Sequence, residues 1–282
     1  MTTNEIDTTT TTNARVEDLT IDEYHEQEAI SSSMQNCYRA EGPVVYEATY
    51  LTREIEHEDR EHFRLGSAVH RMIAGEPVGT LIPREVLSRS GSKAGAAWKD
   101  FAAAHSGELL LKDAELAAAE RIVEAVLANA MARRLIEASD LAEKSIFWRD
   151  AETGLERRVR PDDLAAGVII DVKTTRLRNP DPWRFGRAAY DLGYHRQAAT
   201  YQEGVEAYLG ERLSTTYVIV SKLPPHCVYV AGWEPDDLDL GRRQVRRVLG
   251  QLADHYDRHD WSDPRSETVQ RLLIPRWGWE EE

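Results

Sequence analysis

The order of its sequence patterns predicts that this chain has an α/β fold with a mixed central β-sheet flanked by helices. Long stretches with apolar residues at helical spacing alternate with short β-branched runs, and these runs come as a group of three and a later group of two. The hydrophobic content of 41%, with seven tryptophans, is enough for a core of this kind.

The N-terminal part is predicted to differ from the rest of the chain. Residues 1–18 are rich in threonine, charged and aperiodic, which predicts a disordered tail. Residues 19–282 are expected to form a single domain, with an acidic arm over residues 19–62 and a core over residues 63–282. Within the arm, the three serines at 31–33 indicate a turn or a helix cap.

The predicted helices of the core carry apolar stripes or end at turn signals. Ile122 and Val126, for example, belong to a stripe at helical spacing that we assign to the core. The segment 75–83 contains two prolines and two glycines and is predicted to be a loop. The predicted helices occupy residues 63–74, 93–105, 113–138, 194–209 and 236–259.

The predicted strands are short and rich in β-branched or aromatic residues. A turn over residues 150–154 is expected to join the first two as a hairpin. A loop rich in proline and arginine is expected between the third strand and the helix at 194–209. The predicted strands occupy residues 144–149, 155–160, 168–173, 215–221 and 227–233.

The net charge of −14 argues against a protein that binds DNA, but the charge is unevenly distributed. Residues 1–62 carry fifteen acids and four bases, a net −11, whereas residues 144–200 carry eleven bases and eight acids, a net +3. The acidity therefore lies in the N-terminal arm, and the later region remains compatible with nucleic acid.

Composition also indicates the cellular compartment in which the protein is expected. No run approaches the roughly 20 apolar residues of a membrane span, and the polar, acidic N-terminus is unlike a signal peptide. The two cysteines, Cys37 and Cys227, suit a reducing cytoplasm and cannot supply the four ligands of a typical iron–sulfur cluster. We therefore expect a cytoplasmic protein with no membrane partner.

The segment RPDDLAAGVIIDVKTT contains the strongest functional signal. Asp162 comes before a short buried strand, Asp171 closes its apolar run, and Lys173 follows after one residue. Strand alternation places Asp171 and Lys173 on one face, with Val172 turned away. Two carboxylates that hold a hard cation such as Mg²⁺, with an ammonium that orients the attacking water, meet the needs of phosphodiester hydrolysis. The simpler alternative is an exposed cross-strand pair.

Two more residues are candidates for the same site. Gly66 and His70 lie four apart in the first predicted helix, so Gly66 would permit close approach to the sheet while His70 offers an imidazole to a metal or phosphate. Glu143 would add a further acid, bound directly or through water. The ordinary interpretations are a packed helix glycine beside a half-buried histidine, and a solvated charge at a helix end.

A basic segment with a Gln/Tyr pair follows the candidate site. Gln197 and Tyr201 share a face of the predicted helix at 194–209, and arginines before them suit phosphate contacts that position a duplex without reading its sequence. A solvated basic face is the alternative for each arginine alone. The predicted DNA contacts are Gln197, Tyr201, Arg160, Arg176, Arg178 and Arg196.

The PD…DxK arrangement of Asp162, Asp171 and Lys173 resembles the PD-(D/E)XK nuclease superfamily. The order of GSAVH, the Glu143 strand, GLERRVRPD, IIDVKTT and YHRQAATY is similar to that of the exodeoxyribonuclease VIII (RecE-like) family within it. Tyr24-His25 and the segment at 30–33 also resemble an N-terminal signature of that family, so the resemblance covers about residues 19–233.

The resemblance implies a PD-(D/E)XK nuclease-like core whose Mg²⁺, replaceable by Mn²⁺, is bound by Asp162, Asp171 and His70. Lys173 would be catalytic, the carbonyl of Val172 a further ligand, and the Gln197/Tyr201 element would help to position DNA. The activity implied is 5′-to-3′ digestion of one strand of linear double-stranded DNA, by a ring-shaped homo-oligomer working with a single-strand annealing protein in a bacterial or phage-infected cell. Asp163 directly follows Asp162 and is an alternative to it.

Other functions remain open from the sequence. The same residues would serve an endonuclease or a nuclease that prefers single strands. A retired nuclease fold that only binds DNA or a partner is a third possibility, although it would have no reason to keep Asp162, Asp171 and Lys173 together. A regulator acting through the acidic arm as a DNA mimic is a fourth, but acidic N-termini are more often solvated tails.

Overall fold

The computed structural model describes residues 14–55, 61–139, 143–165 and 167–274. Its N-terminal elements are β1 (Ala14–Glu17), α1 (Ile21–Glu26), α2 (Ser32–Glu41), α3 (Pro43–Tyr46) and the π-helix η1 (Glu47–Leu51). The next part contains α4 (Glu61–Ile73), β2 (Thr80–Leu81), η2 (Arg84–Val86), α5 (Ala96–Ala104), β3 (Leu110–Leu111), α6 (Asp113–Ala128) and α7 (Ala130–Glu137).

The C-terminal half contains most of the strands. The strands are β4 (Ser145–Arg149), β5 (Glu156–Val159), β6 (Asp163–Ala165), β7 (Val168–Thr175), β8 (Ser214–Ser221) and β9 (Val228–Gly232). The helices are α8 (Pro182–Asp191), α9 (Tyr194–Leu209), α10 (Pro235–Arg258) and the short η3 (Pro264–Glu267). No described helix is both long and apolar enough to cross a membrane.

The largest sheet is mixed, as the sequence predicts. Its strand order is β6-β7-β8-β9, with β7 and β8 parallel and the other two pairings antiparallel. The hairpin of β4 and β5 belongs instead to a separate antiparallel sheet of order β1-β4-β5, and β2 pairs with β3 in parallel. The α/β fold is thus confirmed, with the predicted strands divided between two sheets.

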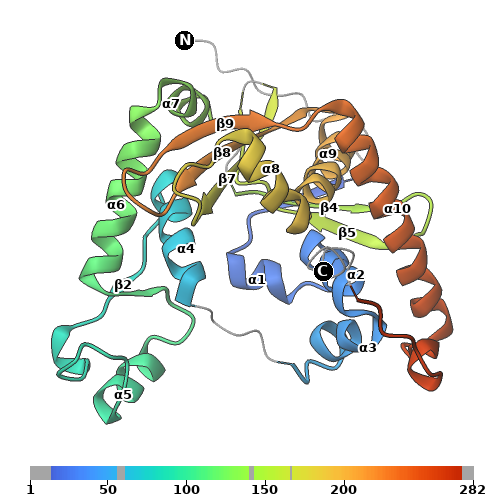
Figure 1. Ribbon diagram of the computed structural model, residues 1–282, viewed down its shortest axis with the longest axis horizontal. Helices are drawn as coiled ribbons and strands as arrows, with labels where there is room; N and C mark the ends of the chain where they lie inside the picture. The colour runs from blue at the N-terminus through green and yellow to red at the C-terminus, as the bar shows by residue number, and fades with distance from the viewer. Residues whose placement is uncertain (1–13, 56–60, 140–142, 166, 275–282) are drawn as a thin grey trace.

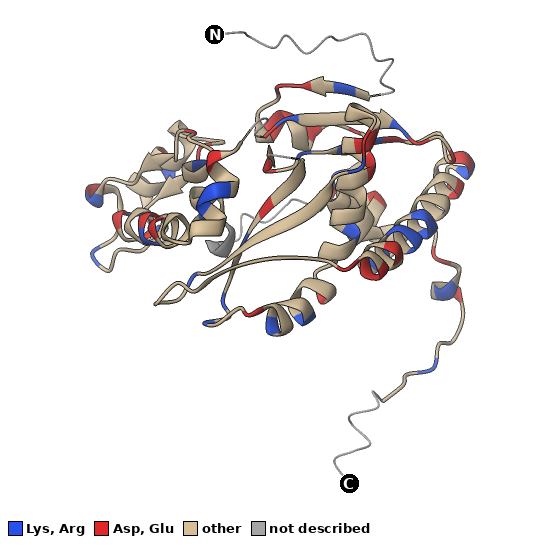
Figure 2. Ribbon diagram, turned by 90° about the horizontal axis from the view of Figure 1, so that it is seen from above, with Lys and Arg blue, Asp and Glu red and all other residues tan. Residues whose placement is uncertain are grey.

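Helices cover both faces of the mixed sheet (Figure 1). Strand β7 shows how alternation divides the core. Ile170 and Val172 pack with residues of α4 and α6, whereas Ile169 packs with residues of α9, β4 and β5. Helix α10 lies along the outer side of α9, and in Figure 2 basic and acidic segments alternate along its length. The candidate site therefore lies on a strand held from both sides.

Three expectations from the sequence are wrong. The disordered tail does not extend to Glu17, because β1 pairs with β4; residues 1–13 lie outside the described residues. A single helix over 113–138 is interrupted at Asn129, whose extended backbone lets its side chain cap α7 by accepting from Met131 N and Ala132 N at 3.1 and 3.0 Å. The proline- and arginine-rich loop contains helix α8.

Candidate active site

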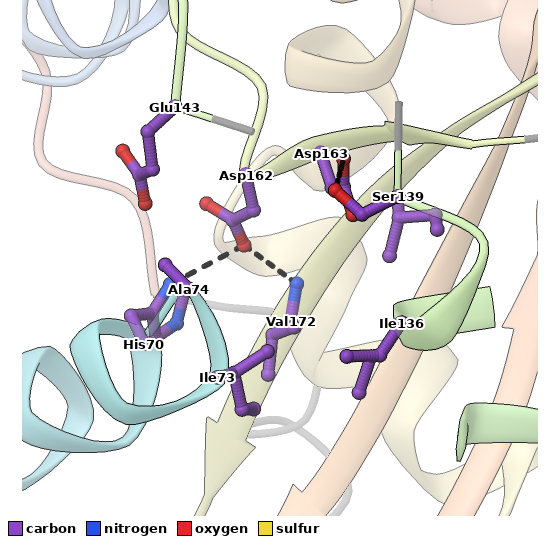
Figure 3. A pocket seen from close by; sticks show the side chains of 10 residues that line it. His70, Ile73, Ala74, Ile136, Ser139, Glu143, Asp162, Asp163 and Val172 are labelled. Carbon is purple, nitrogen blue, oxygen red and sulfur yellow. Dashed lines mark hydrogen bonds and ion pairs between the residues drawn. The ribbon is translucent and has the colours of Figure 1, made fainter. Parts of the chain in front are cut away.

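The site forms where the pairing of strand β7 with strand β6 ends. Strand β6 pairs with β7 only as far as Asp163, opposite Ile170. Beyond that point the N–H of Val172 donates to Asp162 Oδ2 at 2.7 Å, so a side chain takes the place of the next strand residue. This bond fixes one oxygen of Asp162 against the backbone of β7 and leaves the other directed toward the cavity (Figure 3).

Helix α4 brings His70 to this carboxylate. A Cβ atom on Gly66 would lie 3.2 Å from Thr174 Oγ1, which is tighter than an ordinary contact, so the glycine permits the close approach of α4 to β7. One turn later, His70 Nδ1 lies 3.3 Å from Asp162 Oδ2. The structure therefore supports the predicted relation between Gly66 and His70.

Glu143 reaches the same cavity from the start of β4. It has a positive φ of 54°, its N–H donates to the Asp162 carbonyl at 3.1 Å, and its carboxylate accepts from Arg160 Nε at 2.6 Å. One ligand atom each of His70, Glu143 and Asp162 lie within 4.8 Å of one another. Among the described residues, these three side chains form the group that could hold a metal ion. They line a cavity of about 150 Å³.

Asp171 and Lys173 form an ion pair on the neighbouring face of β7. Lys173 Nζ lies 2.7 Å from Asp171 Oδ1 and 4.6 Å from the centre of the Tyr194 ring. Asp171 is 1% exposed, and its other oxygen, Oδ2, has no hydrogen-bond partner among the described residues. Asp171 is not in the group formed by His70, Glu143 and Asp162, although it was predicted as a metal ligand beside Asp162 and His70.

The two aspartates have pKa values shifted in opposite directions. Burial acts to raise the pKa of Asp162, but the His70 imidazolium, Lys173 and the Val172 N–H outweigh it and lower the pKa to about 2. Burial raises the pKa of Asp171 to about 6, with the charge of Asp162 adding to the effect and Lys173 opposing it. Burial thus dominates at Asp171, whereas the contact with His70 dominates at Asp162.

The pKa values of the remaining titratable groups respond to burial and to the same neighbouring charges. Burial disfavours the charged forms of His70 and Lys173, but Asp162 raises the pKa of the first and Asp171 that of the second. Burial and the charge of Asp162 raise the pKa of Glu143, and Arg160 only partly offsets them. A bound cation would relieve this repulsion among carboxylates.

The structure separates the roles of the adjacent acids. Asp162 faces His70 and Glu143, whereas Asp163, which lines the same cavity, accepts through Oδ1 from Ser139 Oγ at 2.7 Å (Figure 3). Of the two, Asp162 is the one that the structure brings into the group of possible ligands.

The predicted DNA contacts divide into two classes. Arg176 and Arg178 are exposed. Gln197 Nε2 donates to Tyr201 Oη at 3.0 Å. Tyr201 lies close enough to the site that the charge of Asp171 helps to raise its pKa. Burial is the largest cause that raises that pKa. Arg176, Arg178 and Gln197 remain compatible with a nucleic acid next to the cavity, whereas Tyr201 is 9% exposed and holds the side chain of Gln197.

Arg160 and Arg196 do not fit the predicted contact with DNA. Arg160 has a side chain only 9% exposed and binds Glu143 and the carbonyl of Leu19. Arg196 is buried, where its guanidinium donates to Asn36 Oδ1 at 3.0 Å and Gln244 Oε1 at 3.1 Å. Both arginines hold segments of the fold together, which corrects the prediction.

Sequence reasoning missed Tyr194 and Ser139. Tyr194 begins helix α9 directly after Gly193, whose φ of 76° favours glycine, and this start places the ring over Lys173. The glycine before the Gln/Tyr helix was the available signal. Ser139 follows α7 and gave no signal, because the break at Asn129 that directs the chain toward β6 was not expected.

Comparison with known proteins gives two findings and one absence. Residues 43–271 match a family described as a PDDEXK-like domain of unknown function. A crystal structure from Eubacterium rectale named "Putative exonuclease" superposes with a TM-score of 0.63 at 17% identity, covering 93% of this chain and 98% of that one. No curated protein matches the chain. At this identity, the structural likeness concerns the fold, which has the PD-(D/E)XK-type arrangement expected from the sequence.

Proposed function

Because the chain belongs to the family of PDDEXK-like domains, we propose that it is a nuclease that hydrolyses DNA phosphodiester bonds with the help of a divalent cation. The observation that carries the proposal is the convergence of His70, Glu143 and Asp162, whose ligand atoms lie within 4.8 Å of one another beside the Asp171–Lys173 pair. Neither the fold nor the family description alone supplies this chemistry.

The residues present fit a cation such as Mg²⁺ or Mn²⁺. Carboxylate oxygens from Glu143 and Asp162 are suitable ligands for both ions, and the imidazole of His70 suits the second better than the first. The buried Asp171 carboxylate, whose Oδ2 has no hydrogen-bond partner among the described residues, supplies negative charge nearby. When bound, such an ion neutralises charge on the phosphate and lowers the pKa of a coordinated water.

Lys173 would act on the other side of the reacting phosphate. Its ammonium is held by Asp171 and by the face of Tyr194, so its position is fixed before DNA arrives. In that position it would orient the attacking water or donate to a phosphate oxygen as charge develops. The exposed Arg176 and Arg178 and the Gln197/Tyr201 pair would position the backbone of the substrate.

The finer proposal is a Mg²⁺-dependent 5′-to-3′ exonuclease that degrades one strand of linear double-stranded DNA. It rests on the order of the motifs around His70, Asp162, Lys173 and Tyr201, which is similar to that of exodeoxyribonuclease VIII. By the same similarity we propose a ring-shaped oligomer, an annealing partner in recombination and a cytoplasmic location. Two exposed arginines after β7 agree with a duplex substrate.

A linear duplex labelled at either the 5′ or the 3′ end tests the proposal. The chain is incubated with Mg²⁺, with Mn²⁺ or with EDTA, and a covalently closed circle serves as the control substrate. We expect loss of the 5′ label as short products in either metal, no reaction in EDTA, and an intact circle. Release of the 3′ label first would reverse the proposed polarity.

The same experiment separates the alternatives. Cleavage of the circle would identify an endonuclease, and faster loss of a single-stranded control would identify a single-strand preference. If no DNA is degraded with either metal, the nuclease proposal is wrong and the chain is a binding protein with a nuclease-like fold.

A further inference from the structure

Helix α8 presents an aromatic and basic outer face. Phe185 and Ala189 are buried at i and i+4 and fix the inner face of the helix. Trp183, Arg187 and Tyr190, at i, i+4 and i+7, lie on the opposite side, and the two aromatic residues are 85% and 47% exposed. Tryptophan is on average a highly buried residue, so an exposed one in register with an arginine and a tyrosine needs an explanation.

This outer face is connected to the candidate active site by packed rings. Tyr194 lies 4.6 Å from Lys173 Nζ, and the centre of its ring is 6.1 Å from that of Phe185 on the inner face of α8. Tyr190 is also held in place, because its ring stacks on His195 at 5.0 Å with an interplanar angle of 12°. The outer face thus lies across the width of helix α8 from Phe185, and Tyr194 and Phe185 connect it to the lysine.

The charge around α8 favours a polyanion. The helix lies at the lower edge of Figure 2, where its basic segments follow an arginine-bearing loop. Among the described residues, Arg184 pairs with the capping Asp181 at 3.4 Å, Arg178 Nη1 donates to the carbonyl of Pro224, and Arg187 has no ion pair. Rows of aromatic rings interleaved with arginines are suited to unpaired nucleotides, whose bases stack while the phosphates meet the positive charge. The basic residues of this region are Arg176, Arg178, Arg184 and Arg187.

We propose that the outer face of α8 binds an unpaired stretch of nucleic acid next to the active site, with bases stacked on Trp183 and Tyr190 and a phosphate bound by Arg187. The inference deepens the proposed nuclease function, on which it rests, by naming a single-stranded part of the substrate. A second copy of the chain that paired through the same face would bring like-charged arginines together, which disfavours that occupant.

Binding of a fluorescein-labelled oligothymidylate of about fifteen nucleotides, followed by anisotropy in EDTA, tests the proposal without cleavage. Trp183→Ala should weaken binding about tenfold, and Trp183→Phe should recover much of the loss, because stacking on one base depends on an aromatic ring. Leu209→Ala, at an exposed apolar position on α9, is the matched control and should bind as the wild type does. Arg187→Gln should reduce the dependence of log K on log salt by about 0.7.

Equal binding by Trp183→Ala and the wild type would overturn the proposal. A change of molecular mass in solution in place of weaker binding would also overturn it, since the face would then be an interface between copies. A chain that binds through Trp183 but cleaves nothing would remove the nuclease proposal and keep this surface. If the wild type cleaves DNA and Trp183→Ala binds the oligonucleotide normally, the nuclease proposal is kept and the proposed binding surface is wrong.

Discussion

Two clusters of buried charge border helix α9, and they differ in how completely the charges are paired. In one, Asp150 Oδ2 lies 3.2 Å from Arg157 and 2.7 Å from Arg246, and Glu203 contacts the same two arginines. Asp150 and Glu203 thus face two arginines, and the exposed Glu152 adds a third acid 3.6 Å from Arg246. In the other cluster, Glu143, Asp162 and Asp171 lie beside Arg160, His70 and Lys173, but Asp171 Oδ2 has no hydrogen-bond partner among the described residues.

The same residue type therefore behaves in opposite ways at similar burial. Asp150 is 4% exposed and Asp171 is 1% exposed. Burial acts to raise the pKa of Asp150, but Arg246 and Thr153 outweigh it and lower the pKa. Burial is the largest cause that raises the pKa of Asp171, the charge of Asp162 adds to it, and Lys173 does not compensate. Both oxygens of Asp150 accept hydrogen bonds, which indicates a structural role, whereas the unpartnered Oδ2 of Asp171 is an acceptor available to a cation.

Replacement of Lys173 by alanine should have the largest effect on activity. We expect cleavage of linear duplex to fall at least about 1000-fold, because the ammonium that orients water or stabilises the phosphate is lost. The thermal midpoint should change little, since Asp171 can remain protonated once its partner is removed. Lys99→Ala on the exposed surface of α5 is the control. Cleavage near the wild-type rate would remove the site assignment.

Replacement of Arg157 by methionine should have the largest effect on stability. The side chain is fully buried, and its loss leaves Asp150 and Glu203 with one arginine between them. We expect the free energy of unfolding to fall by about 3–5 kcal/mol in urea titrations, with cleavage retained below the transition. Arg149→Met, at an exposed position of β4, should change it by less than about 0.5 kcal/mol. Equal stabilities of the two variants would contradict the structural role of this cluster.

A divalent cation should stabilise the protein through the site cluster. At a Mg²⁺ or Mn²⁺ concentration about 100 times the dissociation constant, the gain is about 2.7 kcal/mol, or a rise of roughly 5 °C in the thermal midpoint. Asp162→Asn should abolish the rise and Asp163→Asn should preserve it, because only Asp162 faces His70 and Glu143. The opposite result would exchange the roles of the two aspartates.

Asp171→Asn should increase stability in the absence of metal. The raised pKa means that the folded state disfavours ionised Asp171, so wild-type stability declines as the pH rises from about 4 to about 6. In EDTA at pH 8 the variant should be more stable by about 1–3 kcal/mol, and the advantage should shrink toward pH 4. Asp150→Asn provides the contrast: its pKa is lowered, so the variant should lose stability at pH 8. A pH-independent difference for Asp171→Asn would show that ionisation is not its cause.

Local patterns predicted much of the fold, and the alternation of β7 predicted that Asp171 and Lys173 would meet. Helix α8 was missed because its start resembles a loop. Pro182 occupies the first turn, where its missing N–H costs nothing, and Asp181 caps the helix by accepting from Arg184 N at 3.2 Å. Asp181 and Pro182, which were interpreted as part of a loop, therefore mark the start of helix α8.

The arginines show the limit of residue type as a guide to the site. Arg196 lies among basic residues in sequence, but its partners Asn36 and Gln244 come from α2 and α10. No local pattern encodes contacts between segments so distant in the chain, and the same holds for the approach of His70 to Asp162. The order of the motifs suggested that His70 would approach Asp162, whereas no motif indicated the contacts of Arg196 with Asn36 and Gln244.

The short strand β1 would be lost if the protein were produced without its first residues. Ala14–Glu17 pairs with one side of β4, and the carbonyl of Leu19 accepts from Arg160, whose guanidinium also holds Glu143. A chain trimmed to residue 20 would leave β4 with unpaired backbone groups, a template for self-association. It would also release the arginine that orients a candidate ligand. Residues 14–19 are therefore better retained in any recombinant version.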